Sequence, residues 1–316
     1  MIICKLGVIF MQLLVDYFGF SSNDSISYFD FWQVLSLDCL VFQNVKPKLG
    51  YKYAMHYPGI TFYWSSNKKW HFDISGSGCR VLERLNKEFT WEGLFEFLRS
   101  FLINKFIHIS RLDIACDDLE GNLSFSKMFQ HLCQNKYISR STNIHWTDGS
   151  EQCIYVGSPK SAKRLRIYNK ALEQNVDCKW VRVEFQFRND EALQFILNLY
   201  EYDYNFSYLF LGFLNKTIRF TQTVVDKDNN HHSRAKPADW WYKFVKGIKL
   251  NKYLRLLGRE YDFDSLVRYI QQSCGSSLKT YMKITGGDIG GLLDLLKDVQ
   301  VNSKQRRLIE EIKEME

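Results

Sequence analysis

Three segments in the middle of the chain alternate polar and apolar residues, and this pattern constrains the fold more than any other feature. The segments contain RLDIACDD, RLRIYNK and VRVEFQFR, and we expect strands over 106–117, 164–169 and 179–188. Successive side chains of a strand point to opposite faces of a sheet, so each strand has one apolar face and one polar face. An antiparallel sheet with one face covered by helices and one face open accounts for this pattern.

The polar faces of these strands carry acids and one tyrosine among basic side chains. In chain order, the polar positions are Arg111, Asp113, Asp117, Arg164, Arg166, Tyr168, Lys170, Arg182, Glu184, Gln186 and Arg188. A solvated face with cross-strand ion pairs would explain them. A functional site would also explain them, because carboxylates bind Mg²⁺ or Mn²⁺ and basic side chains bind phosphate. In this second interpretation Tyr168 would attack a phosphodiester that the metal polarises.

The rest of the sequence predicts an α+β fold with a central antiparallel sheet backed by helices. Residues 51–75 alternate and turn at Pro58-Gly59 and at Ser66-Asn67, which is typical of a three-stranded meander. Apolar residues at helical spacing, the first run preceded by the capping residue Thr90, predict helices over 90–102, 124–135 and 190–200. The remaining expectations are a strand and loop over 15–31, a flexible connection over 76–80, and strands over 138–146 and 152–157.

Strand alternation stops in the polar run 226–236, DKDNNHHSRAK, which suggests a domain boundary. We therefore expect an α+β domain over 1–228 and a mainly helical region over 229–316. The helical region has three open roles, which are recognition of duplex DNA, binding of a host helicase, and formation of a homodimer.

Charge and cysteine content narrow the setting in which the protein works. The formal net charge of +7 favours a polyanionic partner only weakly. Aromatic residues make up 16% of the chain and supply stacking platforms as well as core. The 8 cysteines form no CxxC pair and no zinc-module spacing, which favours a reducing cytoplasm.

The N-terminal stretch MIICKLGVIFMQLLV raises the question of a signal peptide or a membrane anchor. Its apolar run after Lys5 is too short to span a bilayer, and no small-residue cleavage site follows. We expect a buried first strand or helix and no membrane association. Met11 is an alternative start, which leaves the status of the residues before it open.

Several motifs occur in a characteristic order along residues 14–250. They are VDYFGFS, FDISGSGCRVLE, SRLDIACDD, YVGSPKSAKRLRIYNKALE, VRVEFQFRND and ADWWYKFVKG. Together they resemble the rolling-circle replication initiators of Gram-positive plasmids, the Rep_trans group. That group also includes relaxases of some integrative conjugative elements, which are mobile genetic elements, and replication proteins of filamentous phages. The order of several motifs makes this resemblance more specific than any single motif.

The resemblance implies a DNA nickase whose fold is similar to that of the HUH endonucleases, with acidic residues in place of the His-apolar-His metal motif. It places the nucleophile at Tyr168 and the ligands for Mg²⁺ or Mn²⁺ at Asp113 and Glu184. Asp117 is a further ligand, for which its neighbour Asp118 is the alternative. The tyrosine would hold the 5′ end as a phosphotyrosine and leave a free 3′-OH at an origin hairpin that is single-stranded at the nick.

Under the same interpretation, a further set of side chains would bind phosphate or brace the acids. They are Arg111, Arg164, Arg166, Lys170, Arg182, Gln186 and Lys160. Lys160 lies in the loop 156–163, which lacks a Walker pattern and has the alternative interpretation of an ordinary hairpin loop. His108 falls, by alternation, on the apolar face of its strand.

Four alternatives stay open from the sequence. The chain could be a conjugative relaxase acting at a transfer origin, since the same chemistry serves both roles. It could also be a non-catalytic DNA-binding regulator on the same fold. Tyr155 is the rival nucleophile, on the strand before that of Tyr168. Trp240 and Trp241 either stack bases or pack their helix.

Overall fold

In the computed structural model, the chain divides into two compact units, residues 1–256 and residues 257–316. The structure describes residues 11–22, 26–66, 69–225, 235–250 and 275–299, together with positions 267, 270, 301, 306 and 309. The expectations about the residues before Met11, and most of the polar run 226–236, lie outside the described residues. Among the helices within those ranges, none is both long enough and apolar enough to cross a membrane.

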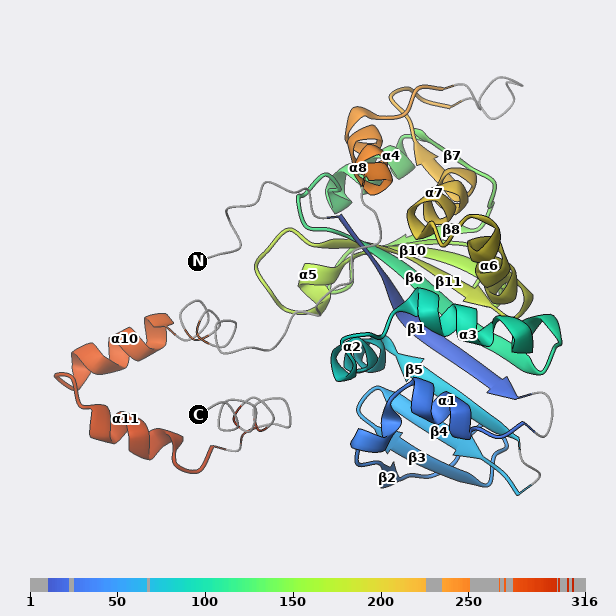
Figure 1. Cartoon of the computed structure of the whole chain (residues 1–316). Coiled ribbons are helices and arrows are strands. Elements are labelled where there is room, and N and C mark those ends of the chain that lie inside the picture. The colour runs from blue at the N-terminus through green and yellow to red at the C-terminus, as the bar shows by residue number, and fades with distance from the viewer. Residues whose placement is uncertain are drawn as a thin grey trace. The chain divides into compact units, whose positions relative to one another are not determined.

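The first unit is built on one antiparallel sheet of ten strands (Figure 1). The strands lie in the order β2 (Gln43–Asn44), β3 (Tyr53–Tyr57), β4 (Ile60–Trp64), β5 (Trp70–Ser75), β1 (Met11–Ser22), β6 (Ile107–Asp118), β11 (Val181–Arg188), β10 (Lys163–Asn169), β9 (Cys153–Val156) and β8 (Ile144–Thr147). The predicted meander is confirmed as β3, β4 and β5. β1 joins this meander to the strands that carry the polar residues.

Helices cover one face of this sheet, as the alternation predicts. The covering helices are α1 (Phe29–Val34), α3 (Trp91–Ile103), α6 (Asp190–Glu201) and α7 (Phe206–Thr217) (Figure 1). Aromatic rings join them to the strands, with centroids 5.5 Å apart for Phe18 and Phe95 and 4.9 Å apart for Phe187 and Phe195. Burial of large aromatics is a main source of hydrophobic stabilisation. The opposite face of the strands remains for polar groups.

The helices α3 and α6 confirm the predictions over 90–102 and 190–200. Thr90 caps α3, because its hydroxyl accepts a hydrogen bond from the backbone N–H of Gly93 at 3.0 Å. Helix α4 (Phe125–Cys133) confirms the prediction over 124–135. These helices were predictable because the features that mark a helix, a capping residue and apolar residues at helical spacing, lie within a few residues of each other.

Two β-bulges change which side chains of β1 and β6 face the polar side. The register between the strands shifts so that Asp16 on β1 and Ser110 on β6 have no partner. A bulge inserts one unpaired residue, so the alternation changes phase beyond it. The prediction that His108 lies on the apolar face is therefore wrong, because Ile107 and Ile109 fill the core instead.

Three other local predictions were wrong. The expected flexible connection over 76–80 begins helix α2 (Gly76–Leu85), in which a Cβ on Gly78 would lie 2.2 Å from the carbonyl oxygen of Gly59. Glycine thus permits close packing there rather than flexibility. The expected strand over 138–146 is divided between β7 (Tyr137–Ser139), which pairs with β12 (Ile218–Phe220) in a separate two-stranded sheet, and β8. Helix α1 begins within the loop expected before residue 31.

Helix α8 (Asp239–Leu250) packs against α7 and belongs to the first compact unit, although the sequence pattern placed it in the region after residue 229. Trp241 is 1% exposed and packs on Phe244, so it serves the core. Among its described residues, the second unit contains α10 (Gly275–Ile284) and α11 (Ile289–Leu296), which are helical as expected.

Candidate active site

The order of the strands brings the three polar faces side by side, because β11 lies between β10 and β6. Across β10 and β11, Arg166 is directly opposite Glu184, and Tyr168 is opposite Arg182. Across β11 and β6, Arg182 is opposite Asp117. Neighbouring strands lie about 4.8 Å apart, so side chains opposite each other on one face are within contact distance. The side chains that the alternation selected on these strands therefore meet.

Tyr168 is buried on this face and is hydrogen-bonded to an acid. Its hydroxyl donates to Oε2 of Glu184 at 2.9 Å, and the residue is 8% exposed. Arg166 forms an ion pair with the other oxygen of Glu184, and its guanidinium carbon lies 5.4 Å from the centroid of the Tyr168 ring. Burial raises the pKa of Tyr168 well above its usual value, and the charge of Glu184 raises it further. The phenol is thus held neutral beside a carboxylate able to accept its proton.

Asp113 and Glu184 form a pair of buried acids on the neighbouring strands β6 and β11, 2% and 1% exposed. Asp113 accepts a hydrogen bond from Nε of Arg111 at 3.0 Å. Burial raises the pKa of Asp113 to about 7, the hydrogen bond with Arg111 opposes that rise, and the charge of Glu184 adds to it. Two buried carboxylates that repel each other are stabilised in their ionised forms by a nearby cation.

The carboxylates of Asp113 and Glu184 fit a small hard cation such as Mg²⁺ or Mn²⁺ only if water or substrate supplies the remaining ligands. In the part of the chain that the structure describes, no group of three or more His, Cys, Asp or Glu side chains is placed to hold a metal ion. Mg²⁺, however, is often bound by one or two carboxylates plus waters and substrate phosphates. Asp113 and Glu184 supply two carboxylates. Both oxygens of Asp117 accept hydrogen bonds from Arg182, at 2.7 and 2.8 Å.

Asp16 also belongs to this face, although the alternation did not select it. Its Oδ2 accepts a hydrogen bond from Nη1 of Arg182 at 2.8 Å, so Asp16 and Asp117 bracket that arginine. Burial raises the pKa of Asp16, and the charge of Arg182 partly offsets this rise. The sequence feature that could have identified Asp16 is its position as the one acid inside the otherwise apolar run LLVDYF. A bulge at that acid turns it toward Arg182, which lies opposite Tyr168.

Asp118, the alternative to Asp117, has a structural role instead. Its carboxylate accepts hydrogen bonds from the backbone N–H of Leu123 at 2.6 Å and of Glu120 at 3.2 Å, and it is fully buried. It therefore holds the turn after β6. By the alternation of the strand, it lies on the face opposite Asp117.

The other side chains that the sequence selected, Tyr155, Lys170 and Lys160, have different neighbours in the structure. Tyr155 on β9 is opposite Arg166, and its hydroxyl interacts with the thiol of Cys153. Lys170 begins helix α5 (Lys170–Glu173), where its Nζ lies 5.5 Å from the centroid of the Tyr168 ring and pairs with the acid at the end of that helix. Lys160 is exposed in the loop between β9 and β10. Of the two candidate nucleophiles, Tyr168 and Tyr155, only Tyr168 has a hydroxyl that is hydrogen-bonded to a carboxylate among the described residues.

Two histidines extend the polar face beyond the acids. His71 on β5 and His108 on β6 are each paired with Ser21 of β1. His71 is 7% exposed, and burial lowers its pKa to about 4, with the nearby His108 lowering it further. His71 therefore stays neutral near neutral pH.

Replacing His71 with glutamine should change how stability depends on pH. The unfolded chain protonates His71 below about pH 6.5, whereas the folded protein does so only near pH 4. His71 therefore makes its full contribution to the free energy of unfolding above about pH 6.5. In the wild type this contribution falls by on the order of 2 kcal/mol between about pH 7 and about pH 5. Asp113 has the opposite effect on stability, because the folded protein protonates Asp113 at a higher pH than the unfolded chain does. Urea unfolding of both proteins at both pH values gives the difference, and an equal pH dependence would contradict a buried neutral His71.

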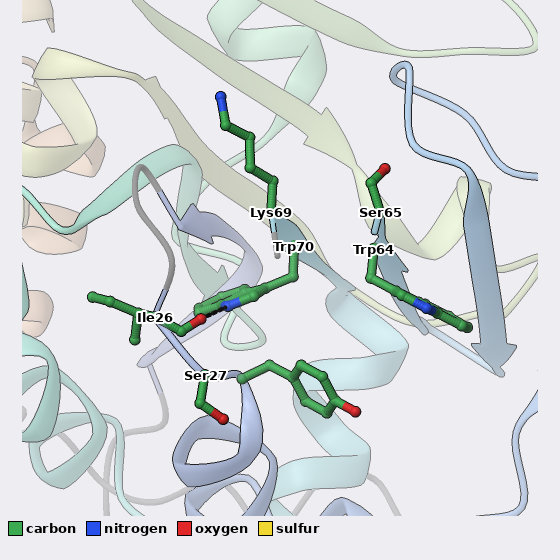
Figure 2. Close-up of a pocket in the computed structure, with 7 residues that line it drawn as sticks. Ile26, Ser27, Trp64, Ser65, Lys69 and Trp70 are labelled. Atoms are coloured by element: carbon green, nitrogen blue, oxygen red, sulfur yellow. Dashed lines mark hydrogen bonds between the residues drawn. The ribbon is translucent and has the colours of Figure 1, made fainter. Parts of the chain in front are cut away.

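A cavity of about 380 Å³ lies away from these acids, at the end of β4 and β5 (Figure 2). Its lining consists of Ile26, Ser27, Tyr28, Trp64, Ser65, Lys69 and Trp70. Trp70 packs on Phe20 and Phe31, so the cavity is on the helix-covered side of the sheet, and Figure 2 shows Lys69 pointing away from the two tryptophan rings. None of these described lining residues is acidic or belongs to β10 or β11. The cavity is therefore separate from the candidate active site.

Comparison with known proteins supports the expected fold. The family model described as Replication initiation factor (Rep_trans) matches residues 107–296, a range that includes Asp113, Tyr168 and Glu184. The structure is similar to that of a rolling circle replication initiator protein from Geobacillus stearothermophilus, with a TM-score of 0.67 and 22% sequence identity. The match covers 78% of this chain and 99% of that chain, and at this identity it shows the fold alone. No curated protein matches the chain. The central antiparallel sheet backed by helices is thereby confirmed.

Proposed function

This chain belongs to the family of replication initiation factors, and on that premise we propose that it nicks one strand of DNA at a replication origin. The observation that most supports this chemistry is the hydrogen bond of 2.9 Å from the Tyr168 hydroxyl to Glu184. A nucleophilic hydroxyl, an adjacent base and surrounding cations are the groups that phosphodiester transfer to a side chain requires.

In the proposed reaction, the phenol oxygen of Tyr168 attacks the phosphorus of the scissile phosphodiester. The bond from Tyr168 to phosphorus forms while the bond from phosphorus to the 3′ oxygen breaks. The 5′ end remains on the protein as a phosphotyrosine, and the 3′ oxygen takes up a proton to become the hydroxyl that primes rolling-circle synthesis. Glu184 accepts the proton of Tyr168. Since burial holds that phenol neutral, a base at hydrogen-bond distance supports attack near neutral pH.

The arginines nearest the nucleophile have different exposure and therefore different roles. The side chain of Arg166 is 35% exposed and ion-paired with Glu184, so it can contact a bound phosphate. The side chain of Arg182 is only 7% exposed and is bracketed by Asp16 and Asp117. Arg182 is thus a positioning residue, whose fixed charge opposes the rise in the pKa of the neighbouring phenol.

We further propose that Asp113 and Glu184 hold a Mg²⁺ or Mn²⁺ ion. When bound, the ion would polarise the phosphate oxygens. The two carboxylates would gain from it, because their mutual repulsion is offset by its charge. Oε2 of Glu184 faces Tyr168, so Asp113 is the ligand whose replacement affects the ion without removing the base.

Replacing Asp113 with asparagine should weaken Mn²⁺ binding to the DNA-free protein by at least about tenfold. Asparagine keeps the size of the side chain and removes the charge that attracts the ion. Titration of Mn²⁺ followed by electron paramagnetic resonance measures the free ion directly, without any need for activity. Asp148→Asn, at an exposed loop position, is the matched control. Equal Mn²⁺ binding by wild type and Asp113→Asn would remove the metal from the proposal and leave the tyrosine chemistry in place.

The nicking proposal is tested by incubating the protein with Mn²⁺ and supercoiled DNA that carries a candidate origin. We expect open-circular DNA and a protein–DNA adduct that survives denaturation and maps by mass spectrometry to Tyr168. Nicking without a covalent adduct would contradict the mechanism. Binding without nicking would favour a non-catalytic regulator, and nicking confined to a transfer origin would favour a conjugative relaxase.

A further inference from the structure

The arginines on the polar face differ in whether an acid neutralises them. Arg111, Arg166 and Arg182 each form an ion pair with an acid of the site. Arg164, on the same strand as Tyr168, takes part in none of the ion pairs found among the described residues. Its charge is therefore the one on β10 that remains available for a ligand.

Aromatic rings, rather than acids, hold Arg164 in place. Its guanidinium carbon lies 4.2 Å from the centroid of the Tyr155 ring. That ring stacks in turn on His145, with centroids 4.7 Å apart and planes 17° apart. The Nε of Arg164 is buried and makes no hydrogen bond within the described part of the chain. A guanidinium stacked in this way keeps its donor edge for a ligand and loses little freedom on binding.

A second donor lies directly across from Arg164 on β11. Gln186 is opposite Arg164 in the strand register and is 7% exposed. Nη2 of Arg188 donates to Oε1 of Gln186 at 2.6 Å, so Nε2 is the end of the amide that can donate to a ligand. The row formed by Arg164 and Gln186 is two residues along the strands from the row of Arg166 and Glu184. These rows are thus about 7 Å apart.

We propose that Arg164 and Gln186 form a subsite for the phosphate next to the scissile phosphate in the bound single strand. The inference rests on the proposed function, because it takes Tyr168 as the point of attack. Two residues along a β-strand span about 7 Å, and this is comparable to the separation of consecutive phosphates in an extended single strand of DNA. Tyr155 and His145 are positioning residues, which orient the guanidinium of Arg164. Tyr155 thereby has a role on this face that does not require its hydroxyl.

The first test is a salt titration of DNA binding by the full chain carrying Tyr168→Phe, which leaves the strand intact. The probe is a fluorescein-labelled single-stranded oligonucleotide that spans the nick mapped on supercoiled DNA. Adding Arg164→Gln should weaken binding about tenfold and reduce the slope of log K against log salt by about 0.7, the value for one phosphate of a single strand. Arg164→Lys should keep the wild-type salt slope, because it keeps the positive charge. Tyr155→Leu should weaken DNA binding, because it removes the ring that stacks on Arg164, whereas Tyr155→Phe keeps the ring and should keep the affinity. An unchanged slope in Arg164→Gln would overturn the subsite.

The second test identifies the phosphate. Uncharged methylphosphonate linkages are placed one at a time on either side of the scissile phosphate. With Arg164 intact, we expect one linkage adjacent to the nick to weaken binding about tenfold, and with Arg164→Gln we expect that loss to disappear. Equal losses in both proteins at every linkage would overturn the subsite, and thermal unfolding confirms that the variants are folded. Absence of a wild-type adduct would instead overturn the proposed function.

Discussion

A Tyr168→Phe protein is expected to lose both strand cleavage and the covalent adduct, with the single-turnover rate falling by at least about 10⁴-fold. The change removes one oxygen, the atom that bonds to phosphorus in the proposed reaction. Affinity for DNA should change only a few-fold, because the ring that lies 5.4 Å from Arg166 and 5.5 Å from Lys170 remains. Nicking of supercoiled DNA, denaturing gels for the adduct and fluorescence anisotropy measure the three quantities.

Two other tyrosines make this prediction specific. Tyr208→Phe, at a residue that is 55% exposed on α7, is the control for a generic loss of a phenol and should nick as wild type does. Tyr155→Phe should still form the adduct, because no acid accepts a hydrogen bond from the Tyr155 hydroxyl among the described residues. An adduct in Tyr168→Phe that disappears in Tyr155→Phe would assign the nucleophile to Tyr155 instead.

Glu184→Gln is expected to slow cleavage by about 10²- to 10⁴-fold near neutral pH. The amide has the same size and can still accept the hydrogen bond of Tyr168, but it cannot take the proton. DNA binding measured without divalent metal should tighten, because one negative charge beside the scissile phosphate is removed and Arg166 loses its ion-pair partner. Slower cleavage together with tighter binding distinguishes loss of a base from a misfolded protein, and single-turnover rates with anisotropy measure both.

The pH dependence and a second acid sharpen this test. Cleavage by Glu184→Gln should recover partly as the pH rises, because hydroxide increasingly replaces the missing base. Glu173→Gln is the matched control, since Glu173 is a half-exposed acid on the neighbouring helix α5 that pairs with Lys170. It should cleave at the wild-type rate. Wild-type cleavage by Glu184→Gln would mean that another group takes the proton of Tyr168.

Much of the polar face could be predicted from alternation alone, because β10 and β11 pair without a bulge. Arg166, Tyr168 and Glu184 therefore occupy the face that a simple period of two assigns to them. The same reasoning placed Asp113 correctly, since the bulge of β6 lies before it, at Ser110. Local periodicity is enough wherever the partner strand follows the same register.

The remaining features depend on partners that are distant in the sequence. Asp16 reaches Arg182 only because pairing with β6 leaves it unpaired in β1. Gly78 looked like part of a flexible connection, yet its missing side chain allows contact with Gly59 in another turn. The adjacency of β6 and β11, which brings Asp113 to the site, is a choice of strand order that no local pattern reveals. Tertiary pairing, rather than propensity, decides such cases.

The insertion of β11 between β6 and β10 has a consequence for chains that are still being made. A ribosome that has passed Tyr168 but not Glu184 has produced the nucleophile and the strand of Asp113, without the strand that joins them. A fragment released at that stage, by early termination or by a protease, would lack the base and the bridge at once. Under the proposed mechanism, a product that ends before Arg188 cannot cut DNA, because it lacks the complete strand that carries the base and links the other two strands.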